Sequence, residues 1–246
     1  MTAKQFPHCP QSGGGPYLRH VHGELRSFEE FSDHSDSPFY CAAGRTPTET
    51  WNEITGKMKV VLAETAAQRQ QGLIEITLDS IRAWHGAIFQ STFPDDAGRL
   101  RWQVQPGAWE HVSFGIAVGT VLTRLIKLVP GTHPRNIQKR VSIACAEFNR
   151  ERERLAEAET RSVHDATFLA GRLYAKLLTI HPFVDGNLRA AYVALQAALL
   201  NQDLLMVEFH DRGAHNEAVT SALRTDSRQS YGPLADLIAE IIKKGV

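Results

Sequence analysis

Apolar residues recur at intervals of three and four positions through most of the chain beyond residue 46, and this spacing predicts amphipathic helices. The clearest stripe lies within residues 162–180 and consists of Val163, Ala166, Ala170, Leu173 and Leu177. The run at residues 188–200 is apolar and alanine-rich almost throughout, which predicts a buried helix. A chain with this pattern is expected to bury its apolar surface by packing helix on helix.

The remaining helices are expected from about residue 46 or 48 onward and at residues 73–89, 120–129, 135–159, 212–224 and 231–244. The 73–89 stripe is Ile74, Leu78, Ile81, His85 and Ile88, and the 135–159 stripe is Ile137, Val141, Ala144, Cys145 and Phe148. Residues 99–119 break the rhythm with short β-rich pieces around Pro106 and Gly107, which predict an irregular hairpin or flap. The predicted fold class is all-α with a small β-hairpin flap.

Two regions differ in composition. Residues 1–45 are rich in Gly, Ser, Pro and His, show no sustained period, and predict a loosely ordered N-terminal arm. The loose spacing of His20, His22 and His34 argues against a metal site there. Residues 46–246 are expected to form one helical domain.

Charge and cysteine content narrow the class of protein. Lysine plus arginine and aspartate plus glutamate both number 27, so nothing favours a nucleic-acid partner or a membrane surface. The charged stretch from Arg150 to Glu159 reads as a solvated helix face. Three cysteines without metal-ligand spacing, and no apolar run long enough to span a membrane, favour a cytoplasmic protein with Cys145 packed in the core.

The loop between the two most apolar helices carries the candidate chemistry. It reads HPFVDGNLRAAY from residue 181 to 192. One interpretation is an ordinary turn, because Asp-Gly-Asn is common turn chemistry. The other is an anion site, because the loop leads into the first turn of a helix, where backbone N–H groups and the helix dipole favour negative charge.

Each residue type in the loop suits a particular role in such a site. Gly186 and Asn187 tolerate positive φ, so consecutive N–H groups can curl into a nest. Arg189 offers a fork of donors to phosphate oxygens, and Asp185 offers a hard oxygen ligand for Mg²⁺. His181 can accept a proton from a hydroxyl near neutral pH. The ring of Phe183 would anchor the loop in the core. From the residues alone, both interpretations stay open.

The loop resembles the signature of the Fic family, His-Pro-Phe-x-Asp/Glu-Gly-Asn-Gly/Lys-Arg with a second arginine farther on. The chain matches at His181, Pro182, Phe183, Asp185, Gly186, Asn187 and Arg189. Residues 81–101, IRAWHGAIFQSTFPDDAGRLR, and residues 169–183, LAGRLYAKLLTIHPF, look like the family's flanking segments. The resemblance covers roughly residues 70–245 and implies a mainly helical Fic fold.

The resemblance also implies an activity: transfer of AMP from ATP to a Ser, Thr or Tyr hydroxyl of a target protein. His181 would then be the base, Asp185 the Mg²⁺ ligand and Arg189 a ligand of the terminal phosphate. Gly186, Asn187 and the backbone of Leu188 would line the phosphate nest. A flap within residues 100–116 would pin the target segment by strand pairing.

The sequence departs from the family pattern in ways that keep other functions open. Leu188 stands where the family has Gly or Lys, Tyr192 stands where the second arginine is expected, and no glutamate carries the family's inhibitory motif. The alternatives are therefore transfer of phosphate, as in Doc relatives, of UMP or of another phosphate-linked group, or a degenerate non-catalytic module that binds nucleotide or a partner. A separate antitoxin protein is a conceivable regulator.

Histidines outside the loop are given structural roles. His85 lies on an apolar stripe and is expected to be packed rather than to bind a ligand. His215 is expected at the surface rather than stacked on an adenine.

Overall fold

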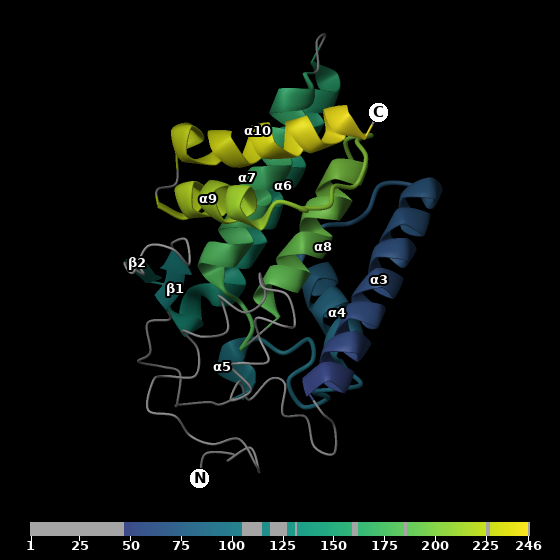
Figure 1. The fold of residues 1–246 in the computed structure, drawn as a ribbon, viewed down its shortest axis with the longest axis vertical. Helices are drawn as coiled ribbons and strands as arrows, with labels where there is room; N and C mark the ends of the chain where they lie inside the picture. Colours follow the sequence, from purple (N-terminus) through teal and green to yellow (C-terminus); the bar gives the residue numbers. More distant parts are fainter. Residues whose placement is uncertain are drawn as a thin grey trace.

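The chain folds into a bundle of helices (Figure 1). The structure is a computed structural model that describes residues 47–104, 115–118, 127–130, 132–158, 162–184, 186–224 and 227–245. The predicted arm at residues 1–45 lies outside the described residues, so that boundary stays a prediction. The all-α fold class is confirmed for the described part.

Helix α7 (Val163–Ile180) is the centre of the bundle. It packs against α6 (Ile137–Glu157), α8 (Asn187–Leu200), α9 (Arg212–Arg224) and α10 (Arg228–Lys244). Small residues on α7 allow this crowding: a Cβ added at Gly171 would lie 3.4 Å from side-chain atoms of Leu234 and Ile238 on α10. The central position of α7 explains why 11 of its 18 residues are buried.

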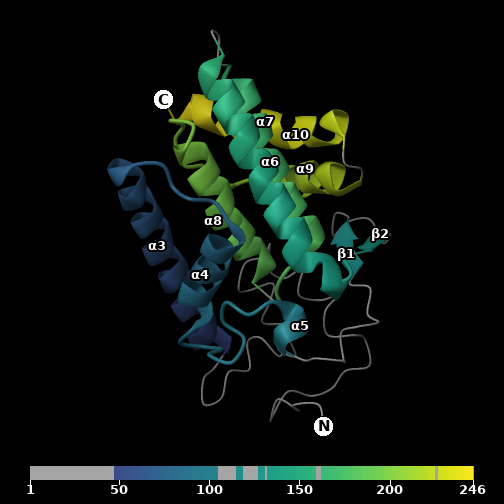
Figure 2. The ribbon, with the colours of Figure 1, turned by 180° about the vertical axis from the view of Figure 1, so that it is seen from behind.

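The remaining long helices cover the outer side of α8. Helix α3 (Pro47–Gln71) and α4 (Leu78–Phe89) pack on each other and on α8, and Figure 2 shows them on the side of α8 away from α9. Among the described residues, none of the helices has both the length and the apolar character needed to cross a bilayer.

Helix α4 starts five residues later than predicted. Thr77 caps it in a capping box with Ser80, and this cap stops the helix from extending back to residue 73. Ile74 lies before the cap, where its N–H and carbonyl both bond to the side-chain amide of Asn201, at 2.8 Å each. The apolar residues Ile74 and Ile76 are buried, but in an extended segment.

The region between α4 and α6 differs most from the prediction. Residues Arg101–Val104 form a short helix, α5, at the start of the predicted flap. Strands β1 (Gly115–Val118) and β2 (Lys127–Pro130) pair antiparallel with Ile116 opposite Val129, so the predicted helix at residues 120–129 is wrong at its end. Residues 105–114 and 119–126 lie outside the described part, and the flap stays a prediction.

Most members of the predicted stripes are buried in the core. All five members of the α6 stripe are buried, including Cys145, whose thiol pKa is raised to about 12 by burial. In α7 the stripe is confirmed except for Val163, which is 43% exposed because it lies in the first turn. Helix α10 begins three residues earlier than predicted, because Ser227 and Ser230 form a second capping box.

Candidate functional site

The loop of interest joins two helices whose ends both adopt left-handed backbone conformations. Helix α7 ends at His181, which has φ 53° and ψ 63° and donates its N–H to the Leu177 carbonyl at 3.0 Å. Helix α8 begins after Gly186, which has φ 74° and ψ 9°. By helix geometry, the amide groups of the first turn of α8, and with them the positive end of its dipole, face this bend.

Asn187 closes the loop on itself. Its Oδ1 accepts the N–H of Phe183 at 2.8 Å, and its Nδ2 donates to the Phe183 carbonyl at 3.1 Å. Asn187 is 3% exposed and Phe183 is completely buried. The Asn187 side chain therefore holds the shape of the bend.

Gly186 has no room for a side chain. A Cβ built there would lie 2.2 Å and 2.5 Å from ring atoms of Phe89 and 3.0 Å from Nε2 of His85. Because Gly186 also has a positive φ, both space and backbone conformation require glycine. The bend is thus pressed closely against α4.

His85 is a packed histidine, as the sequence predicted. It is 2% exposed, its ring stacks on Phe183 with centroids 3.8 Å apart, and its Nδ1 accepts the N–H of Gly98 at 3.0 Å. The second contact fixes the protonation of the ring, since Nδ1 must be the bare nitrogen. His85 thereby links the bend to the segment that leads into α5.

Arg101 is a residue that sequence reasoning did not assign. It is completely buried, and its backbone N–H donates to the Pro182 carbonyl at 2.9 Å. Its Nε donates to the His181 carbonyl at 2.8 Å, and its Nη2 donates to the Thr132 carbonyl. Burial lowers the pKa of Arg101 to about 10, which leaves it charged at neutral pH. The only sequence signal at Arg101 was the family-like stretch GRLR at residues 98–101.

Arg189 lies inside the bundle rather than at its surface. It is 6% exposed, and its guanidinium carbon lies 4.8 Å from the ring centroid of Trp51 on α3. This cation–π contact brings the first turns of α3 against the start of α8. No periodicity argument could have found Trp51, because the two residues are far apart in sequence.

Tyr192 packs where the family pattern expects an arginine. Its hydroxyl donates to the Val207 carbonyl at 2.5 Å, and Gln196 donates to the same carbonyl at 2.7 Å. Burial, and to a smaller extent the nearby carboxylate of Glu208, raise the Tyr192 pKa to about 12, against a hydrogen bond with Gln196 that lowers it. Tyr192 therefore stays neutral and holds the segment after α8.

The expectation that His215 lies at the surface is wrong. It is 3% exposed, its Nε2 lies 3.2 Å from the Tyr174 hydroxyl, and its ring lies 4.3 Å from that of Phe209. Burial lowers its pKa from 6.5 to about 4, so it is neutral at pH 7. His215 lies in the first turn of α9, and this turn faces α7. The polar residues around His215 in the sequence gave no indication that it is buried.

The structure therefore brings His181, Phe183, Gly186 and Asn187 together in one bend and places Arg189 in the first turn of α8, with half-buried Leu188 between Asn187 and Arg189. Asp185, the expected Mg²⁺ ligand, lies outside the described residues. In the part of the chain that the structure describes, no three His, Cys, Asp or Glu side chains gather into a metal site. A magnesium ion held mainly by phosphates needs only one or two protein carboxylates, so this finding fits the expected chemistry.

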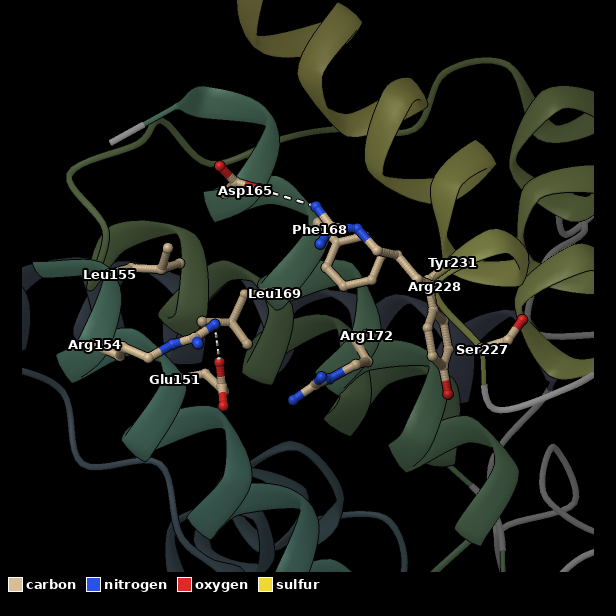
Figure 3. A pocket seen from close by; sticks show the side chains of 10 residues that line it. All are labelled: Glu151, Arg154, Leu155, Asp165, Phe168, Leu169, Arg172, Ser227, Arg228 and Tyr231. Atoms are coloured by element: carbon tan, nitrogen blue, oxygen red, sulfur yellow. Dashed lines mark hydrogen bonds and ion pairs between the residues drawn. The ribbon is translucent and has the colours of Figure 1, made fainter. Parts of the chain in front are cut away.

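A separate cavity of about 280 Å³ lies near the start of α7 (Figure 3). Phe168 on its wall precedes His181 by 13 residues, which is roughly 20 Å of helix. Arg154 pairs with Glu151 at 2.9 Å and Arg228 with Asp165 at 3.4 Å. These arginines are largely neutralised, and the cavity is remote from the bend.

A family profile described as the Fic/DOC family matches residues 75–199. The fold is similar to that of a Fic domain containing signaling protein from Bacteroides thetaiotaomicron, with 15% identity, a TM-score of 0.61, and coverage of 93% of this chain and 81% of that one. It is also similar to Fic-1 (residues 134–508) from C. elegans, at 18% identity, TM-score 0.56, and coverage of 98% and 66%.

A third similar structure contains a nucleotide analogue. The BepC effector protein from Bartonella tribocorum, solved with bound AMPPNP, matches at 19% identity and a TM-score of 0.50, covering 77% of this chain and 86% of its own. At these identities the solved structures establish the fold. The match to the family profile spans half of the chain and includes the whole bend.

Proposed function

Since the chain belongs to the Fic/DOC family, whose profile spans residues 75–199, we propose that it is a Fic-type transferase that moves AMP from ATP to a hydroxyl of a target protein. The observation that carries the proposal is the bend between α7 and α8. It places His181 at one end and the positive end of α8, with Arg189 in its first turn, at the other. An imidazole beside an anion site is the arrangement that this transfer needs.

The reaction follows from those positions. A ring nitrogen of His181 takes the proton of the Ser, Thr or Tyr hydroxyl, and the hydroxyl oxygen attacks the α-phosphorus of ATP. The bond from that phosphorus to the bridging oxygen breaks, and pyrophosphate leaves with the electron pair. The N–H groups at the start of α8 and the guanidinium of Arg189 bind phosphate oxygens and stabilise the charge that develops.

The proposed site suits magnesium because it would combine a protein carboxylate with the phosphate oxygens of ATP. Asp185 is proposed as its protein ligand from sequence alone, and the ion would neutralise phosphate charge when bound. Gly186, Asn187 and the backbone of Leu188 would bind the phosphate chain. Buried Phe183 keeps the loop in place. BepC with AMPPNP supports ATP as the donor by similarity of fold.

A second candidate is transfer of phosphate, UMP or another phosphate-linked group. It is favoured by half-buried Leu188, whose side chain lies beside the proposed nest, and by Tyr192, whose hydroxyl is committed to Val207. A non-catalytic module is the third candidate. The contact of Arg189 with Trp51 favours it, because phosphate oxygens would have to share the guanidinium with that ring.

The proposed partners follow from the chemistry. The acceptor is a protein with an accessible hydroxyl, and a separate antitoxin protein is the proposed regulator. The proposed compartment is the cytoplasm, where ATP is abundant. No nucleic-acid or membrane partner is proposed, because the chain carries 27 cationic and 27 anionic side chains.

Labelled nucleotides separate the three candidates. The purified protein is incubated with cell lysate, Mg²⁺ and ATP labelled at the α or the γ phosphate, with UTP and CDP-choline in parallel. We expect label from the α position on a protein band, and none with His181→Ala, whose thermal stability should match the wild type. Label from the γ position or another donor selects the second candidate. No label from any donor with either protein selects the third.

A further inference from the structure

The backbone at the end of α7 adopts a conformation that needs support. His181 is a non-glycine residue with φ 53°, a region that is sterically unfavourable for a residue with a Cβ. At the C-terminus of a helix, the last carbonyl groups also lack partners within the helix. Both the turn at His181 and the carbonyls that follow it must be stabilised from outside.

Arg101 supplies that support. Its Nε and its backbone N–H donate to two consecutive carbonyls, those of His181 and Pro182, at 2.8 Å and 2.9 Å. The guanidinium is fully buried at the negative end of the α7 dipole, where a positive charge is favoured. Two donors on adjacent carbonyls fix the direction in which the chain leaves α7, and therefore the direction of the His181 side chain.

The third contact ties the bend to a different segment. The Nη2 of Arg101 donates to the carbonyl of Thr132, which is 4% exposed and lies just after β2. Only a guanidinium presents donors in one plane that reach both the His181 and the Thr132 carbonyls, whereas a lysine ammonium offers a single point of contact. Arg101 thus connects α5, the end of α7 and the segment after β2.

We propose that Arg101 is a positioning residue that sets the orientation of the His181 imidazole through the backbone of His181 and Pro182. The inference rests on the proposed role of His181 as base, and adds to it a residue outside the loop. Arg101 does not touch substrate or the reacting atoms. Its loss would leave nucleotide binding by α8 in place and would misdirect the base.

The test compares Arg101→Lys with a neighbouring control, Arg99→Met. Arg99 is exposed, and within the described part of the chain its hydrogen bonds go to carbonyls of its own segment, those of Asp95 and Gln103. We expect Arg101→Lys to lower kcat at least tenfold, since a misplacement of about 1 Å can cost about a hundredfold. The KM for ATP should change less than about threefold, because the groups that bind phosphate are untouched. Arg99→Met should match the wild type in both constants.

A second readout does not depend on activity. The chain has 11 histidines, and the ring signal of His181 in a ¹³C-histidine NMR spectrum is assigned with His181→Ala. We expect Arg101→Lys to shift or broaden that signal and to leave the His215 signal unchanged. If the wild type shows no transfer but the His181 signal responds in this way, the proposed function fails and the positioning role stands.

Three outcomes overturn the positioning role. The first is a folded Arg101→Lys protein with wild-type kcat and an unchanged His181 signal. The second is a variant in which kcat and thermal stability fall while the KM for ATP rises, which indicates general destabilisation. Arg101→Gln, which keeps one donor and removes the charge, serves if the lysine variant does not fold. Failure of both variants to fold would make Arg101 a folding residue.

Discussion

At the scale of single residues, the bend depends on residues that no other residue type can replace. Gly186 is surrounded by the ring of Phe89 and by His85, and Asn187 uses both atoms of its amide on Phe183. The sequence predicted that Gly186 and Asn187 both tolerate positive φ, but of the two only Gly186 adopts it, and Asn187 is the first residue of α8. The sequence did not predict that the side chain of Asn187 would bond to the loop itself. The approach of Phe89 to Gly186 depends on which helices meet, and that information is absent from local sequence.

Replacing Gly186 by alanine tests the packing of the bend against α4. The new Cβ would lie 2.2 Å from the Phe89 ring at a φ of 74°, so ring and backbone must both shift. We expect the free energy of unfolding to fall by about 3 kcal/mol. Urea denaturation monitored by circular dichroism measures it.

The matched control is Gly56→Ala in the exposed middle of α3, where an added Cβ meets nothing within 4 Å. That change should raise the free energy of unfolding by about 0.5–1 kcal/mol, because glycine is a poor helix former. A Gly186→Ala protein as stable as the wild type would show that the bend does not press on Phe89.

At the scale of elements, periodicity predicted most helices and many of their ends, and α9 (Arg212–Arg224) agrees with its prediction at both ends. The α6 stripe was correct in every member, because burial on one face leaves a strong repeat. The predicted starts of α4 and α10 were wrong. The Thr77 cap makes α4 begin later than predicted, and the Ser227 cap makes α10 begin earlier. The polar sequence of α9 gave no sign that its first turn inserts His215 beside Tyr174.

The insertion of His215 should make stability depend on pH. Its pKa falls from 6.5 in the unfolded chain to about 4 in the folded one, so the unfolded state binds the extra proton between these values. The stabilisation is complete above pH 6.5 and is lost as pH falls toward 4, by about 3 kcal/mol at most.

The free energies of unfolding of the wild type and of His215→Gln are measured at several pH values. Their difference separates the contribution of His215 from that of the carboxylates. The wild type should lose its stability advantage over the variant between pH 6.5 and 4. A difference in unfolding free energy that is constant over this range would mean that His215 is protonated as easily in the folded protein as in the unfolded chain.

At the scale of the whole molecule, the candidate site is where segments distant in sequence meet. The motif residues from His181 to Arg189 were evident from the sequence because they are contiguous. Arg101 and Trp51 were not, because each reaches the bend from another part of the chain. The helical bundle holds α7 and α8 side by side, and this arrangement turns one end of the pair into a pocket for anions in our proposal.

Binding of ATP is the most direct measurement of that proposal. Calorimetric titration with Mg²⁺ and ATP compares the wild type with Arg189→Met, which keeps the volume of the buried side chain and removes its donors. The matched control is Arg172→Ala on the wall of the remote cavity. The account predicts equal Kd values for wild type and Arg172→Ala, and a Kd about 10 to 100 times higher for Arg189→Met, as expected for a charged hydrogen bond. Equal affinity of the wild type and Arg189→Met, or no binding to either, would contradict it.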